Sequence, residues 1–323
     1  MFAVFGIFIG HLFQRISAPD AFVRRITDNG TLCVELFFLI SGFLAIKHFD
    51  ERRGLHTHTV GNYYKTRAIR ILPMYYFVIL YFFVTETFVF HDVPQDPSGL
   101  GWLRYIVFFL YGNIRSGTEY LDFWTNLGSV WTICVFMTFY LAMPLLAWII
   151  RNFWSAAAAT FVFWVVRVLM VWKQPVYLHS FTYFVFFCFG IMIWFAYKER
   201  KQMQAYIFIA VMIGINIIAD RTVFEFDGLM NATIAFSLLV LSTMDFHYSS
   251  IRVRKVMNVV DKYSYTVYLA QGIIFCGVID KASGLPKPVV LIISVFGTAL
   301  LSYGIYNYVE SPIQHFLLRT HKN

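Results

Sequence analysis

Residues 131–150 read WTICVFMTFYLAMPLLAWII, a run without one charged side chain. About 20 such residues, rising about 1.5 Å each, cross the hydrocarbon core of a bilayer. The whole chain has the same character, with 59% apolar and only 14% charged residues, against about a quarter charged in a soluble domain. With a mean hydropathy of +0.63, these values predict a polytopic membrane protein. They exclude a soluble cytosolic enzyme, a disordered chain and a nucleic-acid-binding module.

Further apolar segments extend this pattern along the chain. Segments apolar enough for membrane helices, some of them short, are 2–14, 31–46, 69–90, 128–150, 154–172, 181–197, 203–219, 228–244, 264–279 and 288–309. No polar linker divides the chain and no repeat is found. The predicted fold class is therefore an all-α integral membrane protein, with a single bundle of about ten transmembrane helices in one domain over residues 1–323.

The basic residues orient this bundle. Lys and Arg gather after every second span, for example Lys47, Arg52 and Arg53, then Lys198, Arg200 and Lys201. Cytoplasmic loops carry this excess, so both termini are predicted to be cytoplasmic. The net charge of +8 is then a matter of topology and not of an anionic polymer partner. All four cysteines lie in apolar runs, and their spacing predicts neither a disulfide framework nor a metal site.

Two ionisable residues fall inside predicted spans. His11 lies near the outer end of the first span, and Glu35 lies near the outer end of the second. The two spans run in opposite directions, so both side chains reach a similar depth. A carboxylate that accepts one imidazole N–H leaves the other nitrogen free to act as a general base. Because ionisable residues within a membrane are candidate functional sites, the pair is a candidate for catalysis. The alternatives are a packing pair, or two unrelated residues near the interface, where polarity costs less.

A basic cluster marks the inner start of the third span. Lys65, Arg67 and Arg70 precede Pro73, which is expected in the first turns of the helix. Residues three apart share a helix face, so Arg67 and Arg70 present two guanidinium groups suited to phosphates. Simple positive-inside anchoring explains the same charges.

Several weaker candidates come from the remaining spans. Ser41 and Gly42 are small residues that allow close helix packing. Trp131 and Tyr140 are possible substrate-binding residues, although interfacial aromatics or a bundle wall account for them equally well. Arg167 and Lys173, near the outer end of the fifth span, either extend to the interface or help to hold an anionic acceptor.

Taken in order, these segments resemble a known family. His11, then ELFFLISGFL at 35–44, then KTRAIRILPMY at 65–75 are similar to the bacterial acyltransferase family 3 membrane enzymes. Weaker matches follow at 111–113, 131–144, 186–190, 263–269 and 309–313, so the resemblance covers nearly the whole chain. It adds Asn113 as a weak candidate for substrate binding.

The resemblance implies an O-acyltransferase of the bacterial cytoplasmic (inner) membrane. Acyl-CoA, usually acetyl-CoA, would donate its acyl group from the cytoplasm. The acceptor would be a sugar hydroxyl of a lipid-linked or exported polysaccharide at the outer face. His11 and Glu35 match the family's catalytic residues, and Arg67 and Arg70 match its coenzyme-binding arginines, with Lys65 beside them. No metal is implied, and the oligomeric state is left open.

The chain also departs from the family pattern. An arginine that usually precedes the histidine by eleven positions would fall before Met1, so the N-terminus is expected to be incomplete. Phe136 replaces a usual glutamate and Gln271 a frequent histidine. We expect no esterase-like domain after Arg319, which favours a stand-alone polysaccharide or lipid-linked-sugar enzyme. The alternatives are a non-catalytic permease or glycan exporter, or an inactive family member.

Overall fold

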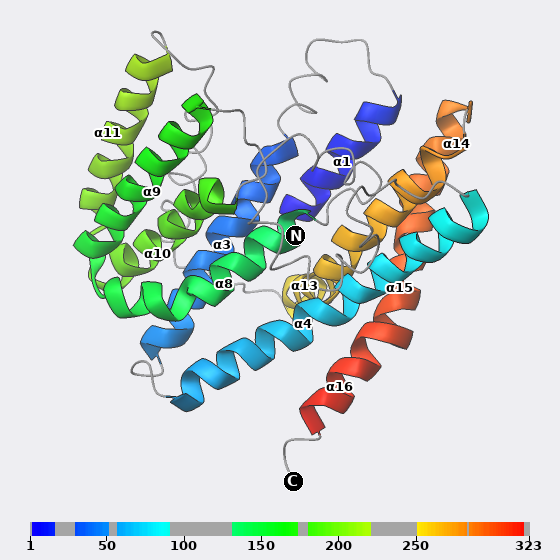
Figure 1. Ribbon diagram of the computed structural model, residues 1–323, viewed down its shortest axis with the longest axis horizontal. Helices are drawn as coiled ribbons and strands as arrows, with labels where there is room; N and C mark the ends of the chain where they lie inside the picture. Colours follow the sequence, from blue (N-terminus) through cyan, green and yellow to red (C-terminus); the bar gives the residue numbers. More distant parts are fainter. Residues whose placement is uncertain are drawn as a thin grey trace. The chain divides into compact units, whose positions relative to one another are not determined.

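The computed structural model describes residues 2–16, 30–51, 57–90, 131–173, 180–220, 251–282 and 284–319 (Figure 1). Within these ranges all regular secondary structure is helical. A described helix overlaps every predicted span except 228–244, which lies outside the described residues. The helical fold class is therefore confirmed for the part of the chain that the structure describes.

The helices follow one another along the chain with short π-helical and 3₁₀ segments between or beside them. Among the described residues up to 220, the elements are α1 (Phe2–Ile16), α3 (Gly30–Glu51), α4 (Thr57–Val84), η1 (Thr85–Phe90), α8 (Trp131–Ile149), α9 (Phe153–Lys173), η3 (Ser180–Tyr183), α10 (Phe184–Lys198) and α11 (Gln202–Asp220). The C-terminal part consists of α13 (Ile251–Gly272), η4 (Ile273–Ile279), α14 (Lys287–Ile292), η5 (Ile293–Gly297), α15 (Thr298–Ile305), η6 (Tyr306–Glu310) and α16 (Ser311–Arg319).

Four described helices are long and apolar enough to cross a membrane. They are Thr59–Phe90, Thr132–Ile149, Ser180–Lys198 and Lys287–Leu317, with shorter apolar helices at Val4–Ile16, Phe153–Leu169 and Gln202–Ile215. Large apolar side chains such as Leu80, Leu145 and Leu300 are exposed along them, as lipid-facing residues are. The protein is therefore a membrane protein. The bundle of ten helices and the cytoplasmic termini stay predictions.

The helix that carries the basic cluster begins earlier than expected. The predicted span began at residue 69, whereas α4 begins at Thr57 and contains Pro73 in its interior. The expectation that Pro73 lies in the first turns was therefore wrong. Hydropathy marks only the apolar length of a helix, and the polar turns before residue 69 continue the same helix without an apolar signal.

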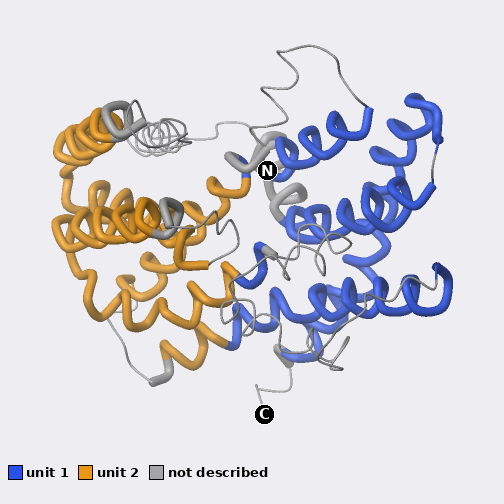
Figure 2. Tube along the Cα trace, turned by 45° about the horizontal axis from the view of Figure 1, so that its top comes forward, with its two compact units in different colours: residues 1–33, 65–134, 248–323 blue, residues 34–64, 135–247 orange. Residues whose placement is uncertain are grey.

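The chain divides into two compact units, shown in different colours in Figure 2. Unit 1 comprises Met1–Cys33, Lys65–Cys134 and Tyr248–Asn323, and unit 2 comprises Val34–Tyr64 and Val135–His247. Each unit is described by itself below, and the single transmembrane domain over 1–323 stays a prediction.

In unit 1, α4 and η1 lie beside α13 and η4. The Tyr265 hydroxyl donates to the Ile71 carbonyl at 3.0 Å, and the Lys281 ammonium donates to the Glu86 carboxylate at 2.9 Å. The bonded residues are 194 and 195 positions apart, so the register is constant along both helices. The two helices therefore run in the same direction, side by side, over about 22 Å.

Two further helices of unit 1 pack on α13 and η4. The Thr266 hydroxyl donates to the Glu310 carboxylate, and the Tyr263 and Tyr306 ring centroids lie 4.6 Å apart. Farther along η4, Ile274 lies close to Gly297, so the C-terminal helical run is antiparallel to α13. The helix α1, which also contacts α14, is parallel to η4 and packs Phe8 against Phe275, with ring centroids 5.5 Å apart.

In unit 2, α10 is the buried centre, with α9 and α11 beside it (Figure 1). Its contact with α3 depends on two glycines. A side chain added at Gly42 would meet the backbone carbonyl of Phe187, and one added at Gly190 would meet the backbone of Leu39. The expectation that Gly42 serves close helix packing is confirmed within this unit.

Adding one methyl group at this crossing should destabilise the protein. We expect Gly42→Ala and Gly190→Ala each to lower the free energy of unfolding by about 1–3 kcal/mol, because the helix backbones have to separate. Thermal melting of the purified protein in detergent measures the effect. Gly214→Ala on α11 is the matched control, since its added carbon would meet nothing within 4 Å. Equal melting temperatures for all three variants and the wild type would contradict the tight crossing.

Candidate functional site

His11 lies near the C-terminal end of α1, in an apolar part of unit 1. Its ring is tilted on Phe275 of η4, with ring centroids 5.9 Å apart. The next residue, Leu12, belongs to a buried cluster with Ile274, Phe275, Ile279 and Val290. The local packing of α1 against η4 therefore sets the position of the imidazole.

Arg15, one turn after His11, ties the end of α1 to the end of η4. Its guanidinium forms a bidentate ion pair with Asp280, in which Nε donates to Oδ1 at 2.7 Å. Nη1 also donates to the carbonyl oxygen of His11 at 3.2 Å, and the guanidinium carbon lies 4.8 Å from the Phe275 ring centroid. Phe275 therefore contacts both His11 and Arg15, and we call Arg15, Phe275 and Asp280 the frame around His11.

A second ion pair lies beside this frame. Glu86 is 1% exposed and accepts a hydrogen bond from Lys281, which follows Asp280 in the chain. The Lys281 ammonium also lies 4.9 Å from the ring centroid of Phe90. Sequence reasoning did not single out Glu86, Arg15 or Asp280. Two features of the sequence pointed to these residues. Arg15 and Asp280 are opposite charges at the ends of predicted spans, and Glu86 is an acid inside the predicted span 69–90.

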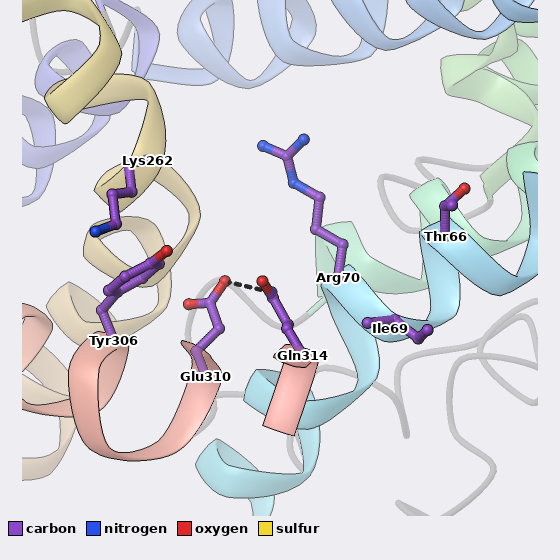
Figure 3. Close-up of a pocket in the computed structure, with 7 residues that line it drawn as sticks. All are labelled: Thr66, Ile69, Arg70, Lys262, Tyr306, Glu310 and Gln314. Carbon is purple, nitrogen blue, oxygen red and sulfur yellow. Dashed lines mark hydrogen bonds between the residues drawn. The ribbon is translucent and has the colours of Figure 1, made fainter. Parts of the chain in front are cut away.

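Farther down the same helices, unit 1 holds a pocket of about 420 Å³. It is lined by Thr66, Ile69, Arg70, Lys262, Tyr306, Glu310 and Gln314 (Figure 3). Arg70 comes from α4 and Lys262 from α13, with Glu310 and Gln314 drawn between them. Of the three predicted basic residues, Arg70 lines the pocket, whereas Lys65 and Arg67 are not among the lining residues.

The charges of this pocket are unequal. Glu310 is 3% exposed, and its two oxygens accept hydrogen bonds from the Thr266 hydroxyl and, at 2.9 Å, from the Gln314 amide. Lys262 places its ammonium 4.7 Å from the ring centroid of Tyr306. Two cations and one anchored carboxylate leave the pocket with an excess of positive charge, as an anion-binding site requires.

The pocket and His11 lie at different levels of unit 1. From Arg70 to Glu86, α4 and η1 rise about 24 Å, and α13 and η4 cover a similar length from Lys262 to Asp280. Since the two helices run parallel, the frame around His11 and the basic pocket lie toward opposite ends of the same helix pair. Phe275, which contacts His11, lies about 20 Å beyond Lys262, so the separation between His11 and the pocket is about two thirds of the roughly 30 Å thickness of a bilayer core.

Glu35, the other predicted catalytic residue, belongs to α3 in unit 2. It is 5% exposed, and its Oε1 lies 3.9 Å from Nη2 of Arg167 on α9. Arg167 also donates to the carbonyl oxygen of Thr182 at 3.1 Å. Arg167 is therefore the cationic neighbour of Glu35, whereas the sequence pattern predicted that it extends to the interface or holds an anionic acceptor. The meeting of Glu35 with His11, which belongs to unit 1, stays a prediction.

The weaker candidates fall on α8 or beyond the described residues. Tyr140 is buried, with its ring centroid 6.1 Å from that of Tyr63. Trp131 is the first residue of α8, and Asn113 lies outside the described residues. Their roles in binding substrate stay predictions. No group of His, Cys, Asp or Glu among the described residues has the arrangement of a metal site.

Phe136 occupies the position where a glutamate is usual in the family that the sequence resembles. Its ring lies in an aromatic cluster of unit 2, with centroid distances of 4.9 Å to Phe38, 5.9 Å to Phe187 and 6.0 Å to Tyr140. An unpaired carboxylate buried in such an aromatic cluster would be unfavourable, so phenylalanine suits these surroundings.

Comparison with protein families matches residues 1–307 to the family described as an acyltransferase domain. No curated protein and no solved structure matches the chain. The matched residues include α1 with His11, α4 with Arg70 and the C-terminal helical run from Lys287 to Asn307. The chain therefore belongs to acyltransferase family 3 and is a membrane acyltransferase.

Proposed function

We propose that the protein transfers an acyl group, in the first instance acetyl, from cytoplasmic acyl-CoA to a sugar hydroxyl. The acceptor is an exported or lipid-linked polysaccharide at the outer face of the bacterial inner membrane. One observation supports the two-sided reaction above all. A basic pocket and a framed histidine lie toward opposite ends of the same pair of parallel helices.

The basic pocket suits the phosphates of the donor. Coenzyme A carries a phosphate and a pyrophosphate on its nucleotide end, and Arg70 and Lys262 offer two cations from different helices. Hydrogen bonds from charged donors to phosphate oxygens are the strong ones. Arg67 and Lys65 precede Arg70 on the same helix and add positive charge to that end of α4. The pantetheine arm would then run along α13 toward His11.

His11 supplies the proton chemistry. The sugar oxygen attacks the thioester carbonyl carbon while the imidazole takes the hydroxyl proton as a general base. A carbon–oxygen bond forms, the carbon–sulfur bond breaks, and the proton ends on the departing coenzyme A thiol. We assign the orientation of the imidazole to Glu35, as the family resemblance implies. Arg15, which donates to the His11 carbonyl, and Phe275, which contacts the ring, hold His11 in position.

The acceptor is assigned from the family resemblance and from the level of His11. Two ion pairs, Arg15 with Asp280 and Lys281 with Glu86, surround that end of unit 1 with polar groups. Such groups suit a hydroxyl-rich ligand. A permease or exporter without chemistry is disfavoured by membership of an acyltransferase family. An inactive family member is the remaining alternative, for which Phe136 is the motivation.

Removal of the imidazole should abolish acylation. We expect His11→Ala to lower the turnover by about 10²- to 10⁴-fold, the usual contribution of a general base. The measurement is the O-acetyl content of the surface glycan in a deletion strain complemented with the wild type, His11→Ala or His315→Ala. His315 is exposed on α16 and serves as the matched control. Loss of ester in the deletion but full ester with His11→Ala would refute chemistry at this residue.

The basic pocket should govern the donor alone. We expect Arg70→Ala and Lys262→Ala each to raise KM for acyl-CoA by about tenfold or more, since a hydrogen bond to a charged group contributes about 1.5–3 kcal/mol. The turnover at saturating donor should change little. Steady-state kinetics with purified protein test this, with Lys287→Ala, exposed at the start of α14, as the control. An unchanged donor dependence would leave Arg70 as a topology anchor.

A further inference from the structure

Gln271 is a buried polar residue that no other part of the mechanism uses. It lies near the end of α13, is 0% exposed, and neither its Nε2 nor its Oε1 has a hydrogen-bond partner among the described residues. Buried polar side chains are nearly always hydrogen-bonded, because leaving a donor or acceptor unpaired inside a protein is unfavourable. Because both amide atoms are unpaired, we expect a bound ligand to supply their hydrogen-bond partners.

The helix register places Gln271 close to the level of His11. Residues three or four apart share a face of a helix, so Gln271 lies on the face of α13 that carries Tyr268 and Phe275. Phe275 contacts His11, and the Tyr268 hydroxyl is hydrogen-bonded to Thr132 at 2.8 Å. Gln271 therefore lies about one helical turn, or about 5.4 Å, from the contact residue of His11, on the side toward Lys262.

The chemistry of the two unpaired atoms narrows the ligand. The Gln271 amide nitrogen needs an acceptor and the amide oxygen needs a donor, and the two amides of a pantetheine arm, separated by two methylene groups, offer both on one side of the arm. Gln271 lies between the basic pocket and His11. A sugar hydroxyl that approaches His11 from the end of the helices away from the pocket would therefore not pass Gln271. The pantetheine arm of acyl-CoA does, and one of its amides is separated from the thioester sulfur by only two methylene groups.

We propose that Gln271 binds the pantetheine amide next to the thioester of the acyl donor. Its Nε2–H donates to the carbonyl oxygen of this amide, and its Oε1 accepts from the N–H of the second pantetheine amide, two methylene groups away. The contact holds the arm at the level that brings the thioester to His11. This inference rests on the proposed function, in which acyl-CoA is the donor, and names one residue that recognises the arm and not the phosphates.

Binding of two ligands separates the arm from the phosphates. Coenzyme A carries both, whereas adenosine 3′,5′-bisphosphate carries phosphate groups without the arm. The dissociation constants of both would be measured on the purified full-length wild type, Gln271→Met, Arg70→Ala and Gln204→Met. Gln204 is exposed on α11 and is the matched control. We expect Gln271→Met to weaken coenzyme A binding by about tenfold, as the loss of well-formed hydrogen bonds would.

The same variant should bind adenosine 3′,5′-bisphosphate as the wild type does, whereas Arg70→Ala should weaken both ligands. The melting temperature of unliganded Gln271→Met should equal or exceed that of the wild type, because an unpaired amide is removed. Wild-type affinity of Gln271→Met for coenzyme A, or equal weakening of both ligands, would overturn the inference and leave the basic pocket standing. Failure of the wild type to bind either ligand would overturn the proposed donor, and the inference with it.

Discussion

The constant register between α4 and α13 is the contact on which the rest of unit 1 depends. Tyr265 with Ile71 fixes one end of the helix pair, and Lys281 with Glu86 fixes the other. Because each end is fixed by a polar group inside apolar surroundings, a slip by one residue would leave a buried donor or acceptor unpaired. The basic pocket and the frame around His11 are thereby held at a set separation along the helix pair, about two thirds of the thickness of a bilayer core.

Three of the four described π-helical segments carry residues of the basic pocket, of the frame around His11 or of the ion pair beside it. Glu86 lies in η1, Phe275 in η4, and Tyr306 and Glu310 in η6. A π-helical turn widens the helix and shifts the face that the following residues present, and such turns are frequent at functional sites. In this protein they turn a carboxylate of η6 toward Thr266 and the pocket, and an aromatic ring of η4 toward His11.

Hydropathy and charge predicted most of the helices and singled out His11 and Arg70, and the family resemblance assigned roles to these two residues. The partners of these residues could not be predicted, because they lie on helices distant in the chain. Lys262 and Asp280 are separated from Arg70 and Arg15 by nearly 200 residues or more, and hydropathy holds no information on register between helices. Pro73 illustrates the same limit, since the polar start of α4 has no apolar signal.

The choice of an amide at position 271 follows from the membrane setting. A charged side chain without a partner is energetically unfavourable inside a membrane span. Accordingly, the described carboxylates Glu86, Asp280 and Glu310 are each hydrogen-bonded within the chain. A neutral amide carries a smaller penalty and still offers one kind of donor and one acceptor. A neutral imidazole, frequent at this position in the family, offers the same pair. The exchange of histidine for Gln271 therefore preserves the hydrogen-bonding capacity that recognition of the donor arm requires.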